Sequence, residues 1–263
     1  MKKLDFRAKR VFVTVKAYPN PSYNYGETVC CAGVDINTGS WVRLYPIPFR
    51  DLENDKRFKK YSLIEANCAK ATDDLRPESF RIQPDSIRII EQIDTRKDGW
   101  DRRRAIIQKL SVKSMCQVIR EEEQHITSMA LIKPEGVSFL IKKRQIKDSD
   151  KREKAYARPG LFDKPKEPVE EIPFLFYYQF KCISEPDCGG HTLSIIDWEI
   201  HQSYRKWRGI YRDEQELLSK IKERWMMMVD STIKDVFFYV GNLHRFQNVF
   251  TVLGVFYPPL KMD

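Results

Sequence analysis

Short runs in which apolar and polar residues alternate occupy the chain up to about residue 95. At 11–16, three valines alternate with Phe, Thr and Lys, a period of two that is typical of a β-strand with one buried face. Further runs of this kind cover residues 28–36, 41–45, 61–71 and 86–93. Gly39, in the turn between the second and third runs, can adopt a positive φ, which favours a β-hairpin there. Five short strands favour a small barrel, and since the chain lacks a strand–glycine loop–helix sequence, they argue against a dinucleotide-binding α/β unit.

The rest of the chain mixes helical and strand-like patterns. Residues 100–123 are helical by the spacing of their apolar residues, with Ser111 or Ser114 as the break or cap between two helices. Residues 213–216 resemble a capping box, and they open a helix whose apolar residues recur at helical spacing as far as Met228. A short helix is predicted over 198–207. The remaining strands are predicted at 129–132, 137–141, 174–183, 192–197, 235–240 and 249–256.

These elements predict a β-rich α+β fold. We expect two small OB-like or PUA-like β-barrel domains with intervening and C-terminal helices. The expected organisation is an N-terminal barrel-like domain at 1–95, a basic helical and linker region at 96–173, and a C-terminal α+β domain at 174–263. The charged stretch 142–158 and the prolines that follow it are typical of a linker or an exposed loop.

Positive charge is concentrated in the middle third of the chain. The protein has 263 residues with 46 Lys+Arg against 37 Asp+Glu, and residues 96–166 alone carry 19 basic and 10 acidic side chains. Such a concentration suits a phosphate-binding surface, because each neutralised phosphate releases counterions. The alternative is a solvated surface with a charged linker, because acidic residues dilute the second cluster. The two clusters are Arg102, Arg103, Arg104, Lys109 and Lys113, then Lys142, Lys143, Arg144, Lys147, Lys151, Arg152, Lys154 and Arg158.

The composition argues against a disordered chain and against a membrane-spanning segment. A hydrophobic content of 42% is too high for a disordered chain, and the apolar stretch 249–257 is far shorter than the ~20 residues of a membrane span. The first residues show no small-residue cleavage site of the secretory type. We therefore expect a cytoplasmic protein with no membrane partner, in which the six cysteines stay reduced.

Cys182, Cys188 and His191 are the residues whose types and spacing most suggest a metal. Two thiolates and an imidazole around a turn that contains Gly189 and Gly190 could supply three ligands to Zn²⁺. The gap between the cysteines is longer than usual, so a fourth ligand has to come from elsewhere in the fold; the candidates are His201, His244, Asp197 and Cys116. The alternative is a hairpin turn with incidental thiols. A metal here would be structural, and zinc is the cofactor that the sequence suggests.

Asp197, Glu199 and His244 are the candidate catalytic residues, although the chain contains no complete catalytic motif. Asp197 and Glu199 could hold Mg²⁺ in a nuclease together with His191 or His244, but no Lys follows at the spacing of a strand-borne nuclease core. The alternative is that Asp197 caps the following helix, with Glu199 in its first turn. His244 lies in a loop, where it could contact a phosphate or act in acid–base chemistry.

Aromatic residues alternate with arginines at 41–50 and at 204–208. Aromatic rings can stack on unpaired bases while guanidinium groups contact phosphates, which is how many proteins bind single strands. In a hairpin the same aromatic side chains could instead fill the core, with the arginines in water. We expect Trp41 and Tyr45 in the core, and Arg43 and Arg50 on a ligand-facing surface.

The stretch CAGVDINTGSWVRLYP at 31–46 resembles the opening hairpin of the bacterial dual-OB-domain proteins, which occur among prokaryotic mobile-element and defence-associated proteins. The positions that match are Cys31, Ala32, Gly33, Gly39, Trp41 and Arg43. After Arg43 the sequence Leu44-Tyr45-Pro46 replaces the expected Arg-Pro. The similarity covers about fifteen residues; it implies oligonucleotide binding on a barrel face and implies no catalytic residues.

The sequence thus predicts a nucleic-acid-binding protein that contacts the phosphate backbone through its central basic region. The expected contacts are Arg43, Arg50, Arg102, Arg103, Arg104, Lys142, Lys143 and Arg144. Two alternatives stay open, a metal-dependent nuclease and an accessory module that binds a protein partner through the acidic C-terminal half.

Overall fold

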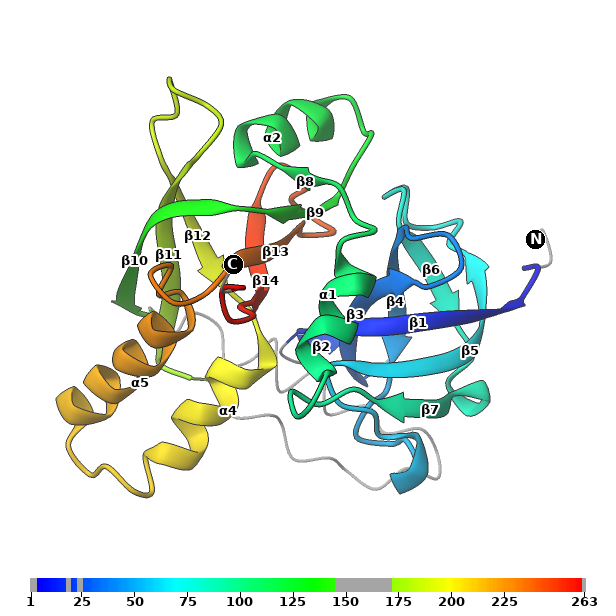
Figure 1. The fold of residues 1–263 in the computed structure, drawn as a ribbon. Helices are drawn as coiled ribbons and strands as arrows, with labels where there is room; N and C mark the ends of the chain where they lie inside the picture. The colour runs from blue at the N-terminus through cyan, green and yellow to red at the C-terminus, as the bar shows by residue number, and fades with distance from the viewer. Residues whose placement is uncertain (1–3, 18–19, 23–25, 145–171, 262–263) are drawn as a thin grey trace.

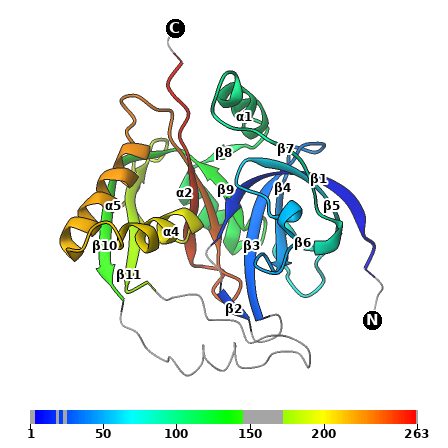
Figure 2. The same cartoon turned by 90° about the horizontal axis from the view of Figure 1, so that it is seen from below.

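The computed structural model describes residues 4–17, 20–22, 26–144 and 172–261. The chain forms two β-rich domains that lie side by side (Figure 1). Figure 2 shows the blue and cyan strands of the N-terminal half on one side of the molecule, the yellow and orange helices on the other, and the red C-terminal strands between them. The β-rich α+β class predicted from the sequence is confirmed.

The first domain is a closed five-stranded barrel. Its strands are β1 (Arg7–Lys16), β3 (Gly26–Asp35), β4 (Trp41–Ile47), β5 (Ser62–Lys70) and β6 (Ser79–Ile82). They follow the order β1-β3-β4-β6-β5, β5 pairs with β1 to close the barrel, and β4 and β6 run parallel, so the barrel is OB-like. Two further strands, β2 (Asn20–Ser22) and β7 (Arg88–Gln92), extend β3 and β5, and two 3₁₀ turns are η1 (Asn54–Lys56) and η2 (Pro84–Ser86).

The alternation of residue types in β1 decides which side chains fill the barrel. Val11 and Val13 lie in the barrel core, whereas Phe12 faces the second domain. The pairing of β1 with β3 shifts between Val13 and Val15, so Val15 faces the second domain as well. The predicted hairpin is confirmed, with Gly39 at φ 71° in its turn. Strand β6 was not predicted from the sequence, because its four residues are too few to show a clear alternation of apolar and polar positions.

The second domain is built on a seven-stranded mixed sheet. Its strands are β8 (Val112–Lys113), β9 (Met129–Ile132), β10 (Pro134–Lys143), β11 (Phe174–Cys182), β12 (His191–Ile195), β13 (Phe237–Asn242) and β14 (Phe250–Phe256). They follow the order β10-β11-β12-β14-β13-β9-β8. Residues 112–143 of the expected middle region therefore contribute strands to this sheet, while residues 145–171 of that region lie outside the described residues.

Four helices accompany the two domains in the described part of the chain: α1 (Gly99–Ile107), α2 (Met115–Glu123), α4 (Trp198–Trp207) and α5 (Glu214–Met228). Helices α4 and α5 cover one face of the second sheet, where Ile200 and Trp225 join the same apolar core as Phe176 and Tyr178 of β11. Three predicted caps are confirmed, because the side chains of Ser114, Asp197 and Asp213 accept hydrogen bonds from the first turns of α2, α4 and α5.

A third apolar core joins the two domains. Phe12, Ala32 and Val34 on the outside of the barrel pack against Tyr239 and Leu253 of the second sheet. Trp41, expected in the core, is half buried and meets the ring of Tyr239 edge-on. The barrel side that carries β1, β3 and the start of β4 is therefore covered by the second domain.

In the part of the chain that the structure describes, no helix combines the length and the apolar composition needed to cross a membrane.

Candidate metal centre and neighbouring charged clusters

Four residues with metal-binding side chains come together between α2 and the β11–β12 hairpin. Cys116 is the second residue of α2, Cys182 ends β11, Cys188 lies in the hairpin loop and His191 begins β12. Their ligand atoms, three Sγ and one imidazole nitrogen, all lie within 4.8 Å of one another. The three residues predicted from the sequence are thus brought together, and Cys116 completes the set from among the four candidates.

All three sulfurs are directed at a single atom, Nε2 of His191. Its distances to Sγ of Cys116, Cys182 and Cys188 are 3.4, 3.4 and 3.3 Å, and Sγ of Cys182 lies 3.9 Å from Sγ of Cys116. One ring nitrogen carries either one hydrogen or one lone pair, so it cannot form three good hydrogen bonds at once. The four ligand atoms therefore surround a common centre, where they could hold a metal ion.

The local sequence explains why the cluster forms. The Ser114 hydroxyl accepts a hydrogen bond from the backbone N–H of Gln117, which starts α2 just before Cys116. Glu185 of the hairpin loop accepts a hydrogen bond from the same hydroxyl and forms an ion pair with Arg120. Gly190 has a φ of 94°, which turns the chain between Cys188 and His191. Burial lowers the pKa of His191, which favours the neutral ring that binds metals.

The other three candidates for the fourth ligand have different surroundings. His201 is buried, and its Nδ1 lies 2.8 Å from the backbone oxygen of Asp197. His244 is exposed in the β13–β14 loop. Among the described residues, these two histidines join no further group of three metal-binding side chains. Among the residues that the structure describes, Asp197 and Glu199 likewise form no group of three ligand atoms with His191 or His244, so the metal site of the nuclease alternative is not assembled there.

Asp197 is instead paired with a lysine of the first domain. Nζ of Lys60 lies 2.8 Å from Oδ2 of Asp197 and 3.3 Å from Oε2 of Glu199, and the side chains of Lys60 and Asp197 are only 6% and 4% exposed. Asp197 also caps α4 with Glu199 in the first turn, so the structural alternative for this pair is confirmed. Burial alone would lower the pKa of Lys60, but the two carboxylates raise it, which keeps the ammonium charged. The pairing of Lys60 with Asp197 could not be predicted from a local pattern, because 137 residues separate the two.

Two of the three consecutive arginines at 102–104 are buried inside the protein. Arg103 and Arg104 are 6% and 9% exposed. Arg103 donates to the backbone oxygen of Ile93 and stacks on Tyr61, and Arg104 pairs with Asp235 at 2.9 Å. Arg102 is exposed but forms two hydrogen bonds, of 2.7 and 2.6 Å, with Glu91. The expectation that Arg103 and Arg104 face a polyanion is wrong, because both are buried, whereas Arg102 stays exposed.

Arg43 is likewise buried, at 3% exposure, against the expectation that it faces a ligand. Its Nη2 donates to the backbone oxygen and the hydroxyl of Ser128, both at 3.1 Å, across the domain interface. Arg50 is exposed in the connection after β4. Lys142 and Lys143 are exposed at the end of β10, and Arg144, which follows them, is half buried. The basic residues from Lys147 to Arg158 lie outside the described residues.

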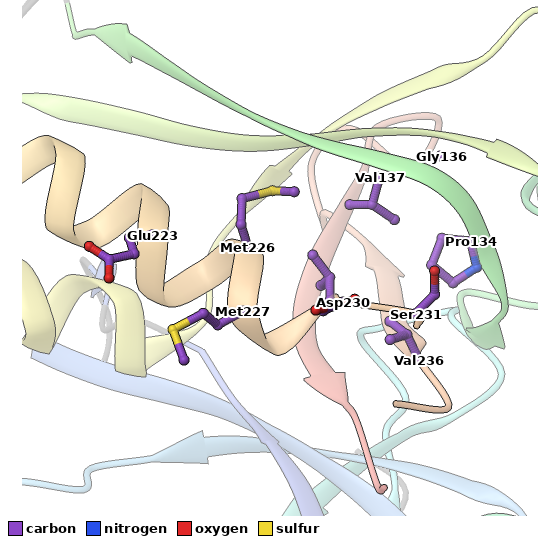
Figure 3. A pocket seen from close by; sticks show the side chains of 10 residues that line it. Pro134, Gly136, Val137, Glu223, Met226, Met227, Asp230, Ser231 and Val236 are labelled. Carbon is purple, nitrogen blue, oxygen red and sulfur yellow. The ribbon is translucent and has the colours of Figure 1, made fainter. Parts of the chain in front are cut away.

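An open cavity of about 560 Å³ lies between α5 and the start of β10 (Figure 3). Its walls are mostly apolar and include Val137 and Met226. Glu223 at its edge pairs with Lys220, and Asp230 accepts hydrogen bonds from Thr232. Both carboxylates are therefore engaged in local contacts, and the cavity offers an apolar surface rather than reactive groups.

Two family models match the chain. One, described as domain of unknown function DUF8758, matches residues 7–109, and the other, domain of unknown function DUF8757, matches residues 111–263. The boundary falls between α1 and β8, so the two matches separate the barrel with α1 from the second sheet. No curated protein matches the sequence.

Proposed function

We propose that this chain, which belongs to the family described as domain of unknown function DUF8757, holds one structural Zn²⁺ between Cys116, Cys182, Cys188 and His191. The observation that carries the proposal is the convergence of four ligand atoms within 4.8 Å. Three thiolates and one imidazole are a set that Zn²⁺ prefers, and four protein ligands leave no open position for a substrate.

The distances between the ligand atoms support a tetrahedral metal. With Zn–S of about 2.3 Å and Zn–N of about 2.0 Å, a tetrahedron separates two sulfurs by about 3.8 Å and a sulfur from a nitrogen by about 3.5 Å. Four of the six distances between the ligand atoms are 3.9 Å between Sγ of Cys182 and Sγ of Cys116, and 3.3–3.4 Å from the three sulfurs to Nε2 of His191. Each value is within about 0.2 Å of the tetrahedral one.

The role of the metal follows from the elements that it joins. Cys116 belongs to α2 and the other three ligands to the β11–β12 hairpin, whose Glu185 also contacts Ser114 and Arg120. Zn²⁺ would therefore fasten α2 to the hairpin. This use of reduced thiols agrees with the cytoplasmic location that we also propose.

Elemental analysis of the purified protein tests the zinc site. After dialysis against a mild chelator we expect about one zinc per chain in the wild type and well below half of that in Cys116→Ser. Cys30→Ser is the matched control, because Cys30 is a free cysteine outside the cluster and should leave the zinc content unchanged. Equal zinc in Cys116→Ser and the wild type, or none in a wild type reconstituted with ZnCl₂, would contradict the proposal.

We also propose that the protein binds nucleic acid. The observation that favours this function is the exposure of Lys142 and Lys143 on a chain whose formal net charge is +9. The buried Arg43, Arg103 and Arg104 add nothing to this surface, so the contacts have to come from exposed basic side chains such as these two lysines.

A salt titration tests nucleic-acid binding. The affinity for a fluorescently labelled 12-nucleotide oligomer should fall as salt rises, with a log–log slope of about −0.7 for each phosphate contacted on a single strand. Arg102→Ala should leave the affinity unchanged, because Glu91 already pairs with this side chain. An absence of binding to single- and double-stranded DNA and RNA at low salt would exclude the function.

A further inference from the structure

One face of the strands β10, β11 and β12 is left uncovered by α4 and α5. Inward side chains of β11, such as Phe176, Tyr178 and Phe180, are buried in the core below the helices. The side chains between them point the other way and are exposed or half buried. This second set, here called the open sheet face, consists of Ser138, Leu140, Lys142, Leu175, Tyr177, Gln179, Lys181, Thr192 and Ser194.

The register of the strands shows that these residues share a face. Leu140 lies opposite Tyr177 and Lys142 opposite Leu175, while Gln179 lies opposite Thr192. Directly paired residues of antiparallel strands project to the same side of a sheet. The amide of Gln179 donates to the hydroxyl of Thr192 at 3.2 Å, which agrees with that assignment.

The chemistry of the open sheet face suits a single strand of nucleic acid. Tyr177 offers a half-buried aromatic ring with Nζ of Lys142 at 5.2 Å from its centre. Lys181 lies four residues from Tyr177 along β11, about 13 Å at the rise of a β-strand. The three strands contain a single acidic residue, Glu135, which lies opposite Lys181 at one end.

We infer that the open sheet face binds single-stranded nucleic acid, with an unpaired base on Tyr177 and the phosphates of neighbouring nucleotides at Lys142 and Lys181. Sheets that present aromatic rings to unpaired bases, with cations alongside for the backbone, are a recurrent means of binding single strands. Gln179, Thr192 and Ser194 add hydrogen-bonding groups for base edges or sugars. The inference rests on the proposed nucleic-acid binding and assigns its site and substrate class.

The first barrel does not offer an equivalent surface on its interface side. The outward residues Ala32 and Val34 of β3 pack against the second domain, and Arg43 of β4 is held by Ser128. A ligand therefore cannot reach this part of the barrel without separating the domains. The open sheet face lies in the second domain and requires no such separation.

Fluorescence anisotropy with labelled 12-nucleotide poly-U RNA and poly-T DNA tests the assignment. The double variant Lys142→Ala/Lys181→Ala should bind at least about tenfold more weakly near 50 mM salt, and its log–log salt slope should be smaller by about 1.4 because two phosphate contacts are lost. Tyr177→Ser should weaken binding roughly fivefold or more, whereas Tyr177→Phe should keep most of the affinity. Lys222→Ala, on the exposed side of α5, is the matched control and should bind like the wild type.

The outcomes separate the two proposals. If the wild type binds neither these single strands nor the corresponding duplexes, nucleic-acid binding itself is refuted, and binding to the duplexes alone overturns the single-strand assignment. If the wild type binds but the double lysine variant binds as tightly as Lys222→Ala, the assignment to the open sheet face is overturned while the function stands. Both lysines are exposed, so their replacement should leave the fold intact, and an unchanged urea midpoint verifies this. Weaker binding to the duplex form of the same sequence is expected, since paired bases cannot stack on Tyr177.

Discussion

Replacing Lys60 by methionine removes the cation from a buried ion pair that joins the two domains. Nζ of Lys60 lies 2.8 Å from Oδ2 of Asp197, and both side chains are less than 7% exposed. Without the ammonium, the Asp197 carboxylate stays buried and retains only the hydrogen bond that caps α4. Breaking a buried pair in this way costs about 3–5 kcal/mol, because one charge is left without its partner.

The double variant Lys60→Met/Asp197→Asn separates this explanation from a simple loss of packing. Asparagine can still cap α4, but it carries no charge. Replacing both members of a buried pair is often nearly neutral, so we expect the double variant to recover at least about 2 kcal/mol of the loss in the single variant. Burial already raises the pKa of Asp197 to about 6 against the opposing effect of Lys60. Without Lys60 this pKa rises further, so the cost of Lys60→Met should shrink as the pH falls and the carboxyl takes up a proton.

Urea unfolding followed by tryptophan fluorescence measures these free energies. We expect the Lys60→Met deficit to be large at pH 7.5, smaller at pH 5, and reduced at both values in the double variant. A deficit below about 1 kcal/mol, or a double variant whose loss equals the sum of the two single losses, would refute the account of Lys60 and Asp197 as a coupled buried pair.

Two other predictions concern residues that the fold holds tightly. Burial lowers the pKa of His201 to about 4, so on acidification the unfolded state takes up a proton near pH 6.5 while the folded state stays neutral until about pH 4. The free energy of unfolding of the wild type should therefore fall by up to about 3 kcal/mol more than that of His201→Gln between pH 7 and pH 4, as measured by urea unfolding. An equal fall in the two proteins would count against this. Gly33→Ala would place a Cβ 2.1 Å from the backbone oxygen of Phe12, across the β1–β3 pair, whereas Gly209→Ala would meet only ordinary contacts at 3.5 Å. Thermal unfolding should show a loss of at least about 2 kcal/mol for Gly33→Ala and little change for Gly209→Ala, and equal melting temperatures would show that the strands can separate to accommodate the methyl group.

Local patterns predicted much of the fold. The alternation of valines in β1, the turn at Gly39 and the acidic caps at Asp197 and Asp213 each depend on residues within a few positions of one another. Such signals are contained in a short stretch of sequence. The pairing of β12 with β14 depends instead on contacts between Ser194 and Thr251, which no local pattern encodes.

The part of the candidate metal centre whose residues lie close together in the sequence was predictable, and the distant part was not. Cys182, Cys188 and His191 lie within ten residues, so their spacing indicated a metal site, while Cys116 is 66 residues from Cys182 and could be named only as one of four options. The prediction failed for Arg103 and Arg104 because a count of charges does not reveal burial. Arg103 donates to the backbone oxygen of Ile93 and Arg104 pairs with Asp235 of the second domain, so neither guanidinium group is presented to solvent.

Zinc K-edge X-ray absorption of the purified protein tests the metal centre most directly, because it counts the ligands around the ion. The arrangement of Cys116, Cys182, Cys188 and His191 predicts three sulfurs at about 2.3 Å and one nitrogen at about 2.0 Å. A spectrum that shows no sulfur ligand, or only one, would contradict a zinc site built from these four side chains.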